Sequence, residues 1–431
     1  MATVGGSPPS GRHRRSSPPL RERLVGVAVG WIPTEPRVRR FLVVSFIDSV
    51  GTGLFLGGSA LFFTRTLGLT AGQIGLGLTL AGVTGFVCLV PIGRISDRAG
   101  ALPTLVALSL WRAACFFAYL FVGGPGWFIL VSCLVGVGEW GTAPVVQGLL
   151  GSFVRPESRV RTMSAMTLIR NVGFTLGGGV AAWVAAVSAS AYRGLVLADA
   201  VSFLVGAALL VRLRAPADPA GERAAAQPPG PRVRPGGRYL TLSVLNGVLF
   251  LHAAILTVGL PLWIATRTDG PAALIGATVV VNTVLAASIQ LRLSRGVDGV
   301  APAGVRQLRA GCLLAVSCLL LAVTGHTDPT PTVVIVLAAT AALTVGEVYQ
   351  AVGAWGVSYG LSPDASRGYY LSVYNLGQTG AMIAGPWLLT SAVLPAGAIG
   401  WTVTAAVLAL CGALVPMVAR GARDPVPAPR P

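Results

Sequence analysis

The sequence has few charged residues: Asp, Glu, Lys and Arg together make up only 11% of its 431 residues. A soluble domain carries about 25%, because its surface must be solvated by water. Hydrophobic residues make up 53% of this chain. Most of the surface of the folded chain must therefore meet lipid, which excludes an ordinary soluble domain.

Lysine is absent from the chain, so that all 32 basic residues are arginine, and the formal net charge is +17. A strongly basic chain can bind nucleic acid through its phosphates. Here the arginines fall mainly in short segments between apolar runs, which is the pattern of the positive-inside rule. We therefore expect a lipid bilayer as a partner, and no nucleic acid.

The residues of active sites and metal centres are scarce. The chain has three histidines, and its six cysteines lie inside apolar runs without metal-ligand spacing. No Gly-x4-Gly-Lys loop for nucleotide phosphates occurs, so ATP is not expected to be the direct energy source. No Ser-His-Asp set is evident either. We expect a protein that is not an enzyme and that uses no metal and no cofactor.

Long apolar runs dominate the chain instead. The first begins at Phe41 and ends near Phe63, which is long enough to cross about 30 Å of hydrocarbon as a helix. Helices are expected because lipid offers no hydrogen-bond partner to an unpaired backbone group. The sequence predicts twelve spans, at residues 41–63, 71–93, 102–123, 127–154, 163–187, 194–212, 239–264, 271–293, 308–325, 332–360, 368–393 and 396–419.

The positions of the arginines predict the topology. With the N-terminus inside, 27 arginines fall in cytoplasmic segments, and only Arg65, Arg193 and Arg267 fall in external loops. The last two, Arg112 and Arg170, lie within spans. This asymmetry predicts a multi-pass protein of the cell (plasma) membrane with both termini cytoplasmic. We expect a monomer.

Short patterns recur in the same order in the two halves of the chain. The offsets are 208, 207 and 204 residues for three pairs: Gly138-Glu139 with Gly346-Glu347, Pro156-Glu157 with Pro363-Asp364, and Asn171-Val172-Gly173 with Asn375-Leu376-Gly377. Three pairs at nearly one offset indicate a duplicated six-helix unit, which is typical of transporters.

The predicted fold is an all-α polytopic membrane protein with twelve transmembrane helices in two pseudo-symmetric six-helix bundles. The predicted domains are a disordered cytoplasmic tail at 1–36, a six-helix half at 37–213, a flexible cytoplasmic linker at 214–238, a second six-helix half at 239–420 and a cytoplasmic tail at 421–431. The tail and the linker are rich in Pro, Gly and Arg and cannot bury apolar surface.

The loop between the second and third spans reads Gly93-Arg-Ile-Ser-Asp97-Arg98-Ala-Gly100. It resembles the signature of the major facilitator superfamily, which is a Gly, three residues, Asp-Arg, one residue and a Gly. The basic residues that usually follow are absent here. The resemblance implies that Gly93, Asp97, Arg98 and Gly100 form a conformational-switch loop, with Asp97 facing the N-terminus of a helix.

The fifth span, residues 170–179, resembles the glycine-rich fifth helix of the drug/proton antiporter branch. The Gly-Pro pair of that helix is missing and occurs as Gly385-Pro386 in the eleventh span. The family's arginine in the fourth span is also missing, and Glu139 stands in that region. The resemblance implies a secondary transporter that works by alternating access, with spans one, four, seven and ten around a central cavity.

Acids inside spans are costly and therefore indicate function. Asp48, Glu139 and Glu347 lie in spans that the resemblance places at the cavity, and we expect them to couple transport to protons. A rotation of the two halves could alternately hydrate and bury such a carboxylate. The alternative is an acid that is hydrogen-bonded between helices or solvated in the cavity.

Arg170, in the fifth span, is the expected counter-ion of one of these acids, or a binder of an anionic substrate group. Arg112 and Asp199 lie in spans that the resemblance places at the periphery, so we expect them to be structural. The further substrate-binding candidates are polar or aromatic residues within spans: Asn171, Gln147, Asn246, His252, Tyr349, Trp355, Tyr374 and Asn375.

The sequence favours proton-coupled efflux of small amphipathic compounds, such as drugs or secondary metabolites. Its expected partners are a small-molecule substrate and protons. Two alternatives remain open. One is a proton-coupled importer of a small polar or anionic metabolite on the same fold. The other is a membrane sensor that transports nothing.

Overall fold

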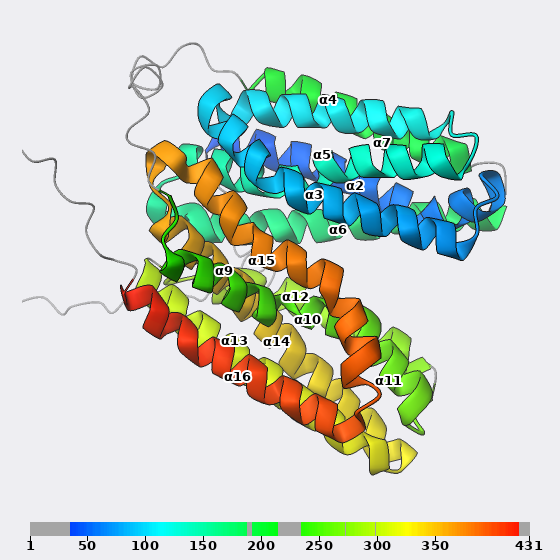
Figure 1. Cartoon of the computed structure of the whole chain (residues 1–431), viewed down its shortest axis with the longest axis vertical. Coiled ribbons are helices and arrows are strands. Elements are labelled where there is room, and N and C mark those ends of the chain that lie inside the picture. The colour runs from blue at the N-terminus through cyan, green and yellow to red at the C-terminus, as the bar shows by residue number, and fades with distance from the viewer. Residues whose placement is uncertain (1–34, 188–191, 214–233, 272, 298, 422–431) are drawn as a thin grey trace, which may run out of the picture.

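The structure is a computed structural model that describes residues 35–187, 192–213, 234–271, 273–297 and 299–421 (Figure 1). Every element in these ranges is helical, and they contain no strand. The predicted tails at 1–36 and 421–431 and the predicted linker at 214–238 lie largely outside the described residues.

Twelve long helical passes follow one another in the described ranges. The first six are α2 (Pro36–Leu61), α3 (Ala71–Ala99), α4 (Ala101–Tyr119), α5 (Pro125–Phe153), α6 (Arg159–Val187) and α7 (Tyr192–Val211). The seventh pass joins α9 (Gly237–Phe250), α10 (His252–Ala254), the π-helical η3 (Ile255–Gly259) and α11 (Leu260–Arg267). The last five are α12 (Ala273–Leu293), α13 (Val300–Val323), α14 (Pro329–Leu361), α15 (Arg367–Leu388) with its π-helical extension η6 (Leu389–Val393), and α16 (Gly397–Gly421).

Short helical turns complete the described chain: the π-helical η1 (Phe62–Thr66) and the 3-10 turns η2 (Pro156–Ser158), η4 (Thr324–His326) and η5 (Asp364–Ser366). The predicted all-α class is confirmed, with its helices in two bundles. Figure 1 shows α2 to α7 in one group and α9 to α16 in the other.

Local sequence explains where several helices begin. Thr70 caps α3 in a reciprocal pair: its hydroxyl accepts a hydrogen bond from the backbone N–H of Gln73 at 3.3 Å, and the Gln73 side chain accepts from the N–H of Thr70 at 3.0 Å. Pro125 and Pro329 open α5 and α14, where the missing N–H of proline has no partner to lose. Gly100 has φ +90°, which lets the chain turn from α3 into α4 within a single residue.

Two passes are less apolar than the rest. Ten helices in the described ranges are long and apolar enough to cross a membrane, judged by length and composition. The passes that fall short are α6 and α15, the fifth helix of each half. Helix α6 carries Arg159, Arg161 and Arg170, and α15 carries Asn375 and Gln378. These two helices must be held in the bilayer by their neighbours.

Equivalent glycines pack in the same way in the two halves. A methyl group at Gly173 of α6 would lie 2.8 Å from the Cβ atom of Ser49 on α2. A methyl group at Gly377 of α15 would overlap the carbonyl oxygen of Ser243 on α9. Glycine therefore lets the fifth helix of each half approach the first helix closely, as small residues do in membrane bundles.

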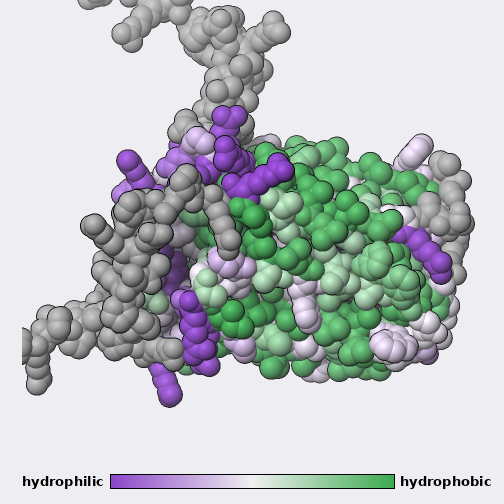
Figure 2. Space-filling view, turned by 90° about the horizontal axis from the view of Figure 1, so that it is seen from above, coloured by the Kyte–Doolittle hydropathy of each residue, from purple (hydrophilic) through white to green (hydrophobic). Residues whose placement is uncertain are grey.

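The surface has the polarity of a membrane protein. Figure 2 shows a broad hydrophobic face with hydrophilic residues gathered mainly at one end. Large apolar side chains of α4 and α7 are exposed, among them Trp111, Phe117, Leu197 and Leu204. Such a surface would aggregate in water and is suited to lipid. The chain is therefore a multi-pass membrane protein.

Candidate functional site

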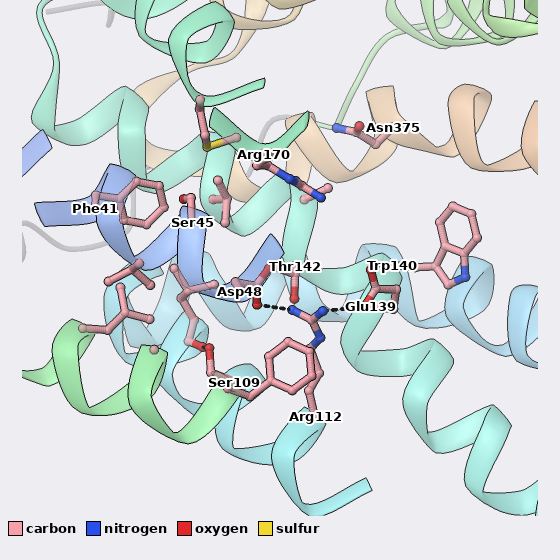
Figure 3. Close-up of a pocket in the computed structure, with 18 of the residues that line it drawn as sticks. Phe41, Ser45, Asp48, Ser109, Arg112, Glu139, Trp140, Thr142, Arg170 and Asn375 are labelled. Carbon is pink, nitrogen blue, oxygen red and sulfur yellow. Dashed lines mark hydrogen bonds and ion pairs between the residues drawn. The ribbon is translucent and has the colours of Figure 1, made fainter. Parts of the chain in front are cut away.

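A cavity of about 370 Å³ lies in the first half and is bordered on one side by α15 of the second half. Residues of α2, α3, α4, α5, α6, α7 and α15 line it. Its charged lining groups are Asp48, Arg112, Glu139 and Arg170 (Figure 3). Its other lining residues include Phe41, Ser45, Ser109, Trp140, Thr142, Met166, Phe203, Asn375, Gln378, Thr379 and Met382.

Arg112 of α4 lies between two carboxylates from neighbouring helices. Its Nη1 donates to Oδ1 of Asp48 on α2 at 3.0 Å, and its Nη2 lies 2.7 Å from Oε2 of Glu139 on α5. Figure 3 shows both interactions at the floor of the cavity. The guanidinium carbon lies 3.8 Å from the ring centroid of Phe203 on α7. One buried arginine therefore connects four helices of the first half.

The prediction that Arg170 is the counter-ion of an acid is wrong in this structure. Arg170 lines the same cavity, but it stacks 5.5 Å from the ring of Phe174 and forms no ion pair with any residue of the described ranges. Arg112, expected at the periphery, takes that place instead. Its long side chain reaches the centre from α4, because glycine at Gly138 leaves room for its stem against α5.

Glu347, the third predicted coupling acid, lies apart from this group and does not line the cavity. Its Oε2 accepts a hydrogen bond from Nδ2 of Asn282 on α12 at 2.9 Å. The same amide donates to Thr344 at 3.0 Å. In the part of the chain that the structure covers, Glu347 has no ion pair. The two repeat-related acids thus have different partners, a guanidinium for Glu139 and an amide for Glu347.

Two predicted substrate-binding residues are packed inside the second half. Asn246 accepts hydrogen bonds through Oδ1 from Gln350 at 2.7 Å and from Gln307 at 3.4 Å. The ring of Tyr374 packs 5.8 Å from that of Tyr239 and is buried. Neither lines the cavity in this state.

Four other candidates also lie away from the cavity. His252 is buried, and neither ring nitrogen has a hydrogen-bond partner among the described groups. Tyr349 faces Arg306 at 5.4 Å. Trp355 is partly buried against the cores of both halves, and Asn171 is exposed on α6.

Gln147 and Asn375 join the two halves. Nε2 of Gln147 donates to the hydroxyl of Ser358 at 2.8 Å, and the hydroxyl of Tyr359 donates to the carbonyl of Gln147 at 2.6 Å. Nδ2 of Asn375 donates to Oε1 of Gln147 at 3.4 Å, and Asn375 also lines the cavity. These bonds connect α5 with α14 and α15.

Asp97 makes another polar connection between the halves. Its Oδ1 accepts from the N–H of Gly368 at 2.6 Å, and its Oδ2 accepts from the N–H of Tyr369 at 2.8 Å. Both N–H groups belong to the first turn of α15, where a carboxylate is favoured by the helix dipole. The guanidinium of Arg94 lies 4.8 Å from the ring of Tyr369. We call the contacts of Asp97 and Gln147 across the halves the seal.

The remaining members of the predicted switch loop are two glycines that allow close packing or a turn, and one exposed arginine. A methyl group at Gly93 would collide with Ser372 of α15, so glycine allows α3 and α15 to meet. Gly100 forms the turn, and Arg98 is exposed. Figure 1 shows the two halves close together near the start of α9 and diverging toward α11. The seal therefore closes one end of the molecule.

Sequence comparison relates the chain to known transporters. The sequence model described as "Major Facilitator Superfamily" matches residues 41–386. "Multidrug resistance protein MdtH" of Aeromonas hydrophila is 32% identical over 126 residues, which are 29% of this chain and 32% of that protein. The "Bacillibactin exporter" of Bacillus subtilis is 30% identical over 119 residues, which are 25% of this chain and 30% of that protein. The matched region spans only about a third of the length of these curated relatives.

Structural comparison extends over the whole bundle. A bacterial homologue of the iron transporter ferroportin in an outward-facing state superposes with a TM-score of 0.70 at 16% identity, covering 90% of this chain and 99% of that one. The human organic anion transporter MFSD10 (TETRAN) gives a TM-score of 0.66 at 20% identity, covering 88% of this chain and 100% of that one. At these identities the likeness establishes the fold.

Proposed function

Because the chain belongs to the Major Facilitator Superfamily, a family of membrane transporters rather than enzymes, we propose that it exports small amphipathic compounds by alternating access, driven by the proton gradient. The observation that carries the proposal is the sharing of one guanidinium by two cavity carboxylates, Asp48 and Glu139. The names of the partial relatives, a multidrug resistance protein and a siderophore exporter, agree with efflux.

The shared arginine gives a physical route to proton coupling. The Glu139 side chain is 43% exposed and that of Asp48 is 27% exposed, so both can meet a proton or a substrate in the cavity. A proton on either carboxylate weakens its ion pair with Arg112. A cationic or hydrogen-bonding substrate group competes for the same oxygen atoms. Substrate and proton then bind in opposition, which is the thermodynamic basis of antiport.

The rest of the lining suits an amphipathic molecule. Trp140, Met166 and Met382 offer aromatic and adaptable apolar contacts. Asn375 and Gln378 of α15 offer amides from the second half. A compound bound between them touches both halves, so its binding can depend on how the halves are arranged.

We assign the seal to the cytoplasmic end of a plasma-membrane protein whose termini are both cytoplasmic. In that orientation the structure is closed to the cytoplasm, and release of the Asp97 and Gln147 contacts opens the inward-facing state. The pattern of arginines along the sequence supports this orientation.

Arg170 favours a second candidate function. It is a cavity guanidinium without an ion pair among the described residues, and it can bind a carboxylate or phosphate group in two parallel hydrogen bonds. In this alternative the substrate is an anionic metabolite that is imported together with protons. The negative charge of a bound substrate near Glu139 favours the protonated carboxyl, so the anion and the proton bind together.

One experiment separates these functions. The purified protein in liposomes is offered pairs of amphipathic compounds that share a scaffold and differ only in carrying an amine or a carboxylate, with and without a pH gradient. Efflux predicts amine-bearing or neutral compounds moving against the proton flux. Carboxylates moving with the proton flux would establish the second candidate, and flux of no compound in a broad panel would leave only a non-transporting role. Susceptibility of an overexpressing strain compared with a deletion strain supplies the compounds to test.

A further inference from the structure

Asp199 of α7 is a buried carboxyl group that the proposed cycle does not yet use. It is 0% exposed. Its Oδ1 accepts a hydrogen bond from Ser202 at 3.3 Å, whereas its Oδ2 has no hydrogen-bond partner in the described structure. A methyl group at Gly51 of α2 would lie 2.7 Å from Oδ1, so α2 closes over this carboxyl. A buried carboxyl oxygen without a hydrogen-bond partner requires an explanation, and one explanation is a partner that reaches it at another stage of the transport cycle.

Arg112 is the cation that interacts electrostatically with this carboxyl. Its guanidinium lies on the ring of Phe203, and Asp199 precedes Phe203 by four residues on α7. Residues four apart on a helix are neighbours on one face, with Cβ atoms about 5–6 Å apart. Nε of Arg112 has no partner among the described groups. An unpartnered donor thus belongs to the guanidinium on the ring of Phe203, and an unpartnered acceptor lies four residues before Phe203 on α7.

Asp199 has no ion pair in the described structure. The groups that face it are Asp48 from α2, Arg112 from α4 and Glu139 from α5. Three carboxyls thus share a single guanidinium, and the two bonds in place are those to Asp48 and Glu139. A buried charge is stable only when it is paired, so any event that weakens these two bonds favours a move of the guanidinium to Asp199.

We propose that Asp199 is the second docking site of Arg112 in the transport cycle. When Asp48 and Glu139 each take up a proton from the cavity, both bonds to Arg112 are lost, and the guanidinium moves along the face of Phe203 and pairs with the Asp199 carboxylate. When the two protons leave, the guanidinium returns to Asp48 and Glu139. Arg112 thus alternates between two partner sets without entering the lipid, and Asp199 acts as a positioning residue that makes proton uptake by the cavity acids possible. The inference rests on the proposed proton coupling.

The test compares Asp199→Asn with the wild-type protein in liposomes. The matched control is Val201→Ala, an exposed position on the same helix that leaves Asp199 and Ser202 in place. Two readouts are taken: uphill transport driven by a pH gradient, and substrate counterflow at equal pH. Wild-type protein without gradient-driven transport would defeat the proposed function itself, before any variant is considered.

In the Asn variant Arg112 has no alternative partner, so the cavity acids give up their bonds to it only at lower pH. We expect gradient-driven transport to fall by about tenfold or more, and the pH midpoint of transport to move about one unit toward acid. Counterflow should stay within about twofold of wild type, because the substrate site is unchanged. The control should behave as wild type, and Asp199→Glu should restore part of the coupling.

An unchanged pH profile with normal folding of the Asn variant would overturn the proposal. Should that variant fail to fold, Phe203→Leu examines the same path, because it keeps an apolar side chain and removes the ring along which the guanidinium moves. The pH midpoint of gradient-driven transport should shift in this variant, and a midpoint equal to that of wild type would equally overturn the proposal.

Discussion

Arg112 and Leu314 occupy the same place in the two halves of the protein. A methyl group at Gly138 would lie 2.7 Å from Cγ of Arg112, and one at Gly346 would lie 2.9 Å from Cγ of Leu314. Each glycine directly precedes the acid of its half. The repeat has therefore kept the packing of the third helix against the fourth while changing the side chain that fills it from a cation to a hydrocarbon.

This difference predicts that coupling resides in the first half. In Glu139→Gln the charge that competes for Arg112 is removed, so we expect gradient-driven transport to be lost while downhill exchange survives. In the matched variant Glu347→Gln, the side-chain oxygen can still accept the hydrogen bond from Asn282, so gradient-driven transport should persist. Transport assays in liposomes with and without a pH gradient decide the matter. The reverse pattern, with loss only in the Glu347 variant, would place coupling in the second half.

Arg112 should also be a large contributor to stability. Replacement by Gln removes the only guanidinium that pairs with Asp48 and Glu139 among the described residues, and losing hydrogen bonds to partly exposed carboxylates costs about 1.5–3 kcal/mol. We expect a clearly lower unfolding temperature in detergent. Adding Glu139→Gln to Arg112→Gln removes one stranded charge and should recover part of the loss. If Arg112→Gln melts like the wild type, the ion pairs do not carry the stability assigned to them.

Asp97→Asn should slow the cycle without weakening substrate binding. The carboxylate accepts two backbone N–H groups of α15 across the halves, and an amide offers a single oxygen without charge. Loss of such a cap costs about 0.5–2 kcal/mol, which corresponds to an equilibrium shift of a few-fold to about thirtyfold between the sealed and open states. Turnover rate and equilibrium binding are the measurements. Arg98→Gln, at an exposed neighbour, is the control. A large loss of binding with normal turnover would contradict this role.

Gly377→Ala should disrupt the second half. Its added methyl group would collide with the Ser243 carbonyl of α9, and overpacking of this kind costs about 1–3 kcal/mol or more. The control is Gly276→Ala on α12, where a methyl group would meet no atom within 4 Å. Alanine there should be neutral or slightly stabilising. Monodispersity on size-exclusion chromatography and thermal unfolding report both effects. Equal behaviour of the two variants would show that α9 and α15 can separate at no cost.

The sequence predicted those features that depend on the chemistry of single residues, such as apolar length, glycine packing and charge inside the membrane. Apolar length predicted the helical passes, and the paired glycines of the two halves predicted a repeat that the packing of Gly173 and Gly377 displays. The acid Glu139 was identified because charge in a membrane is rare. Arg170 was expected as the counter-ion of one of the acids, and Arg112 takes that place in this structure, because span membership says which helix holds an arginine and not how far the side chain reaches. One feature of the sequence could have identified Arg112 and Asp199 as site residues. They are opposite charges in two spans that would otherwise face lipid, so each needs a partner inside the bundle.

The limited apolarity of α6 and α15 has a consequence for how the protein is made. Helix α6 carries Arg170, and α15 carries Asn375 and Gln378. Each of these polar groups opposes insertion, so either helix alone gains little free energy by moving from water into lipid. Each is preceded in the chain by four helices of its own half, and α2 and α9 offer the glycine-matched surfaces on which they pack. During synthesis, α6 and α15 should therefore wait at the translocon until those earlier helices can receive them. Insertion of the fifth helix is then the step that limits how fast each half assembles.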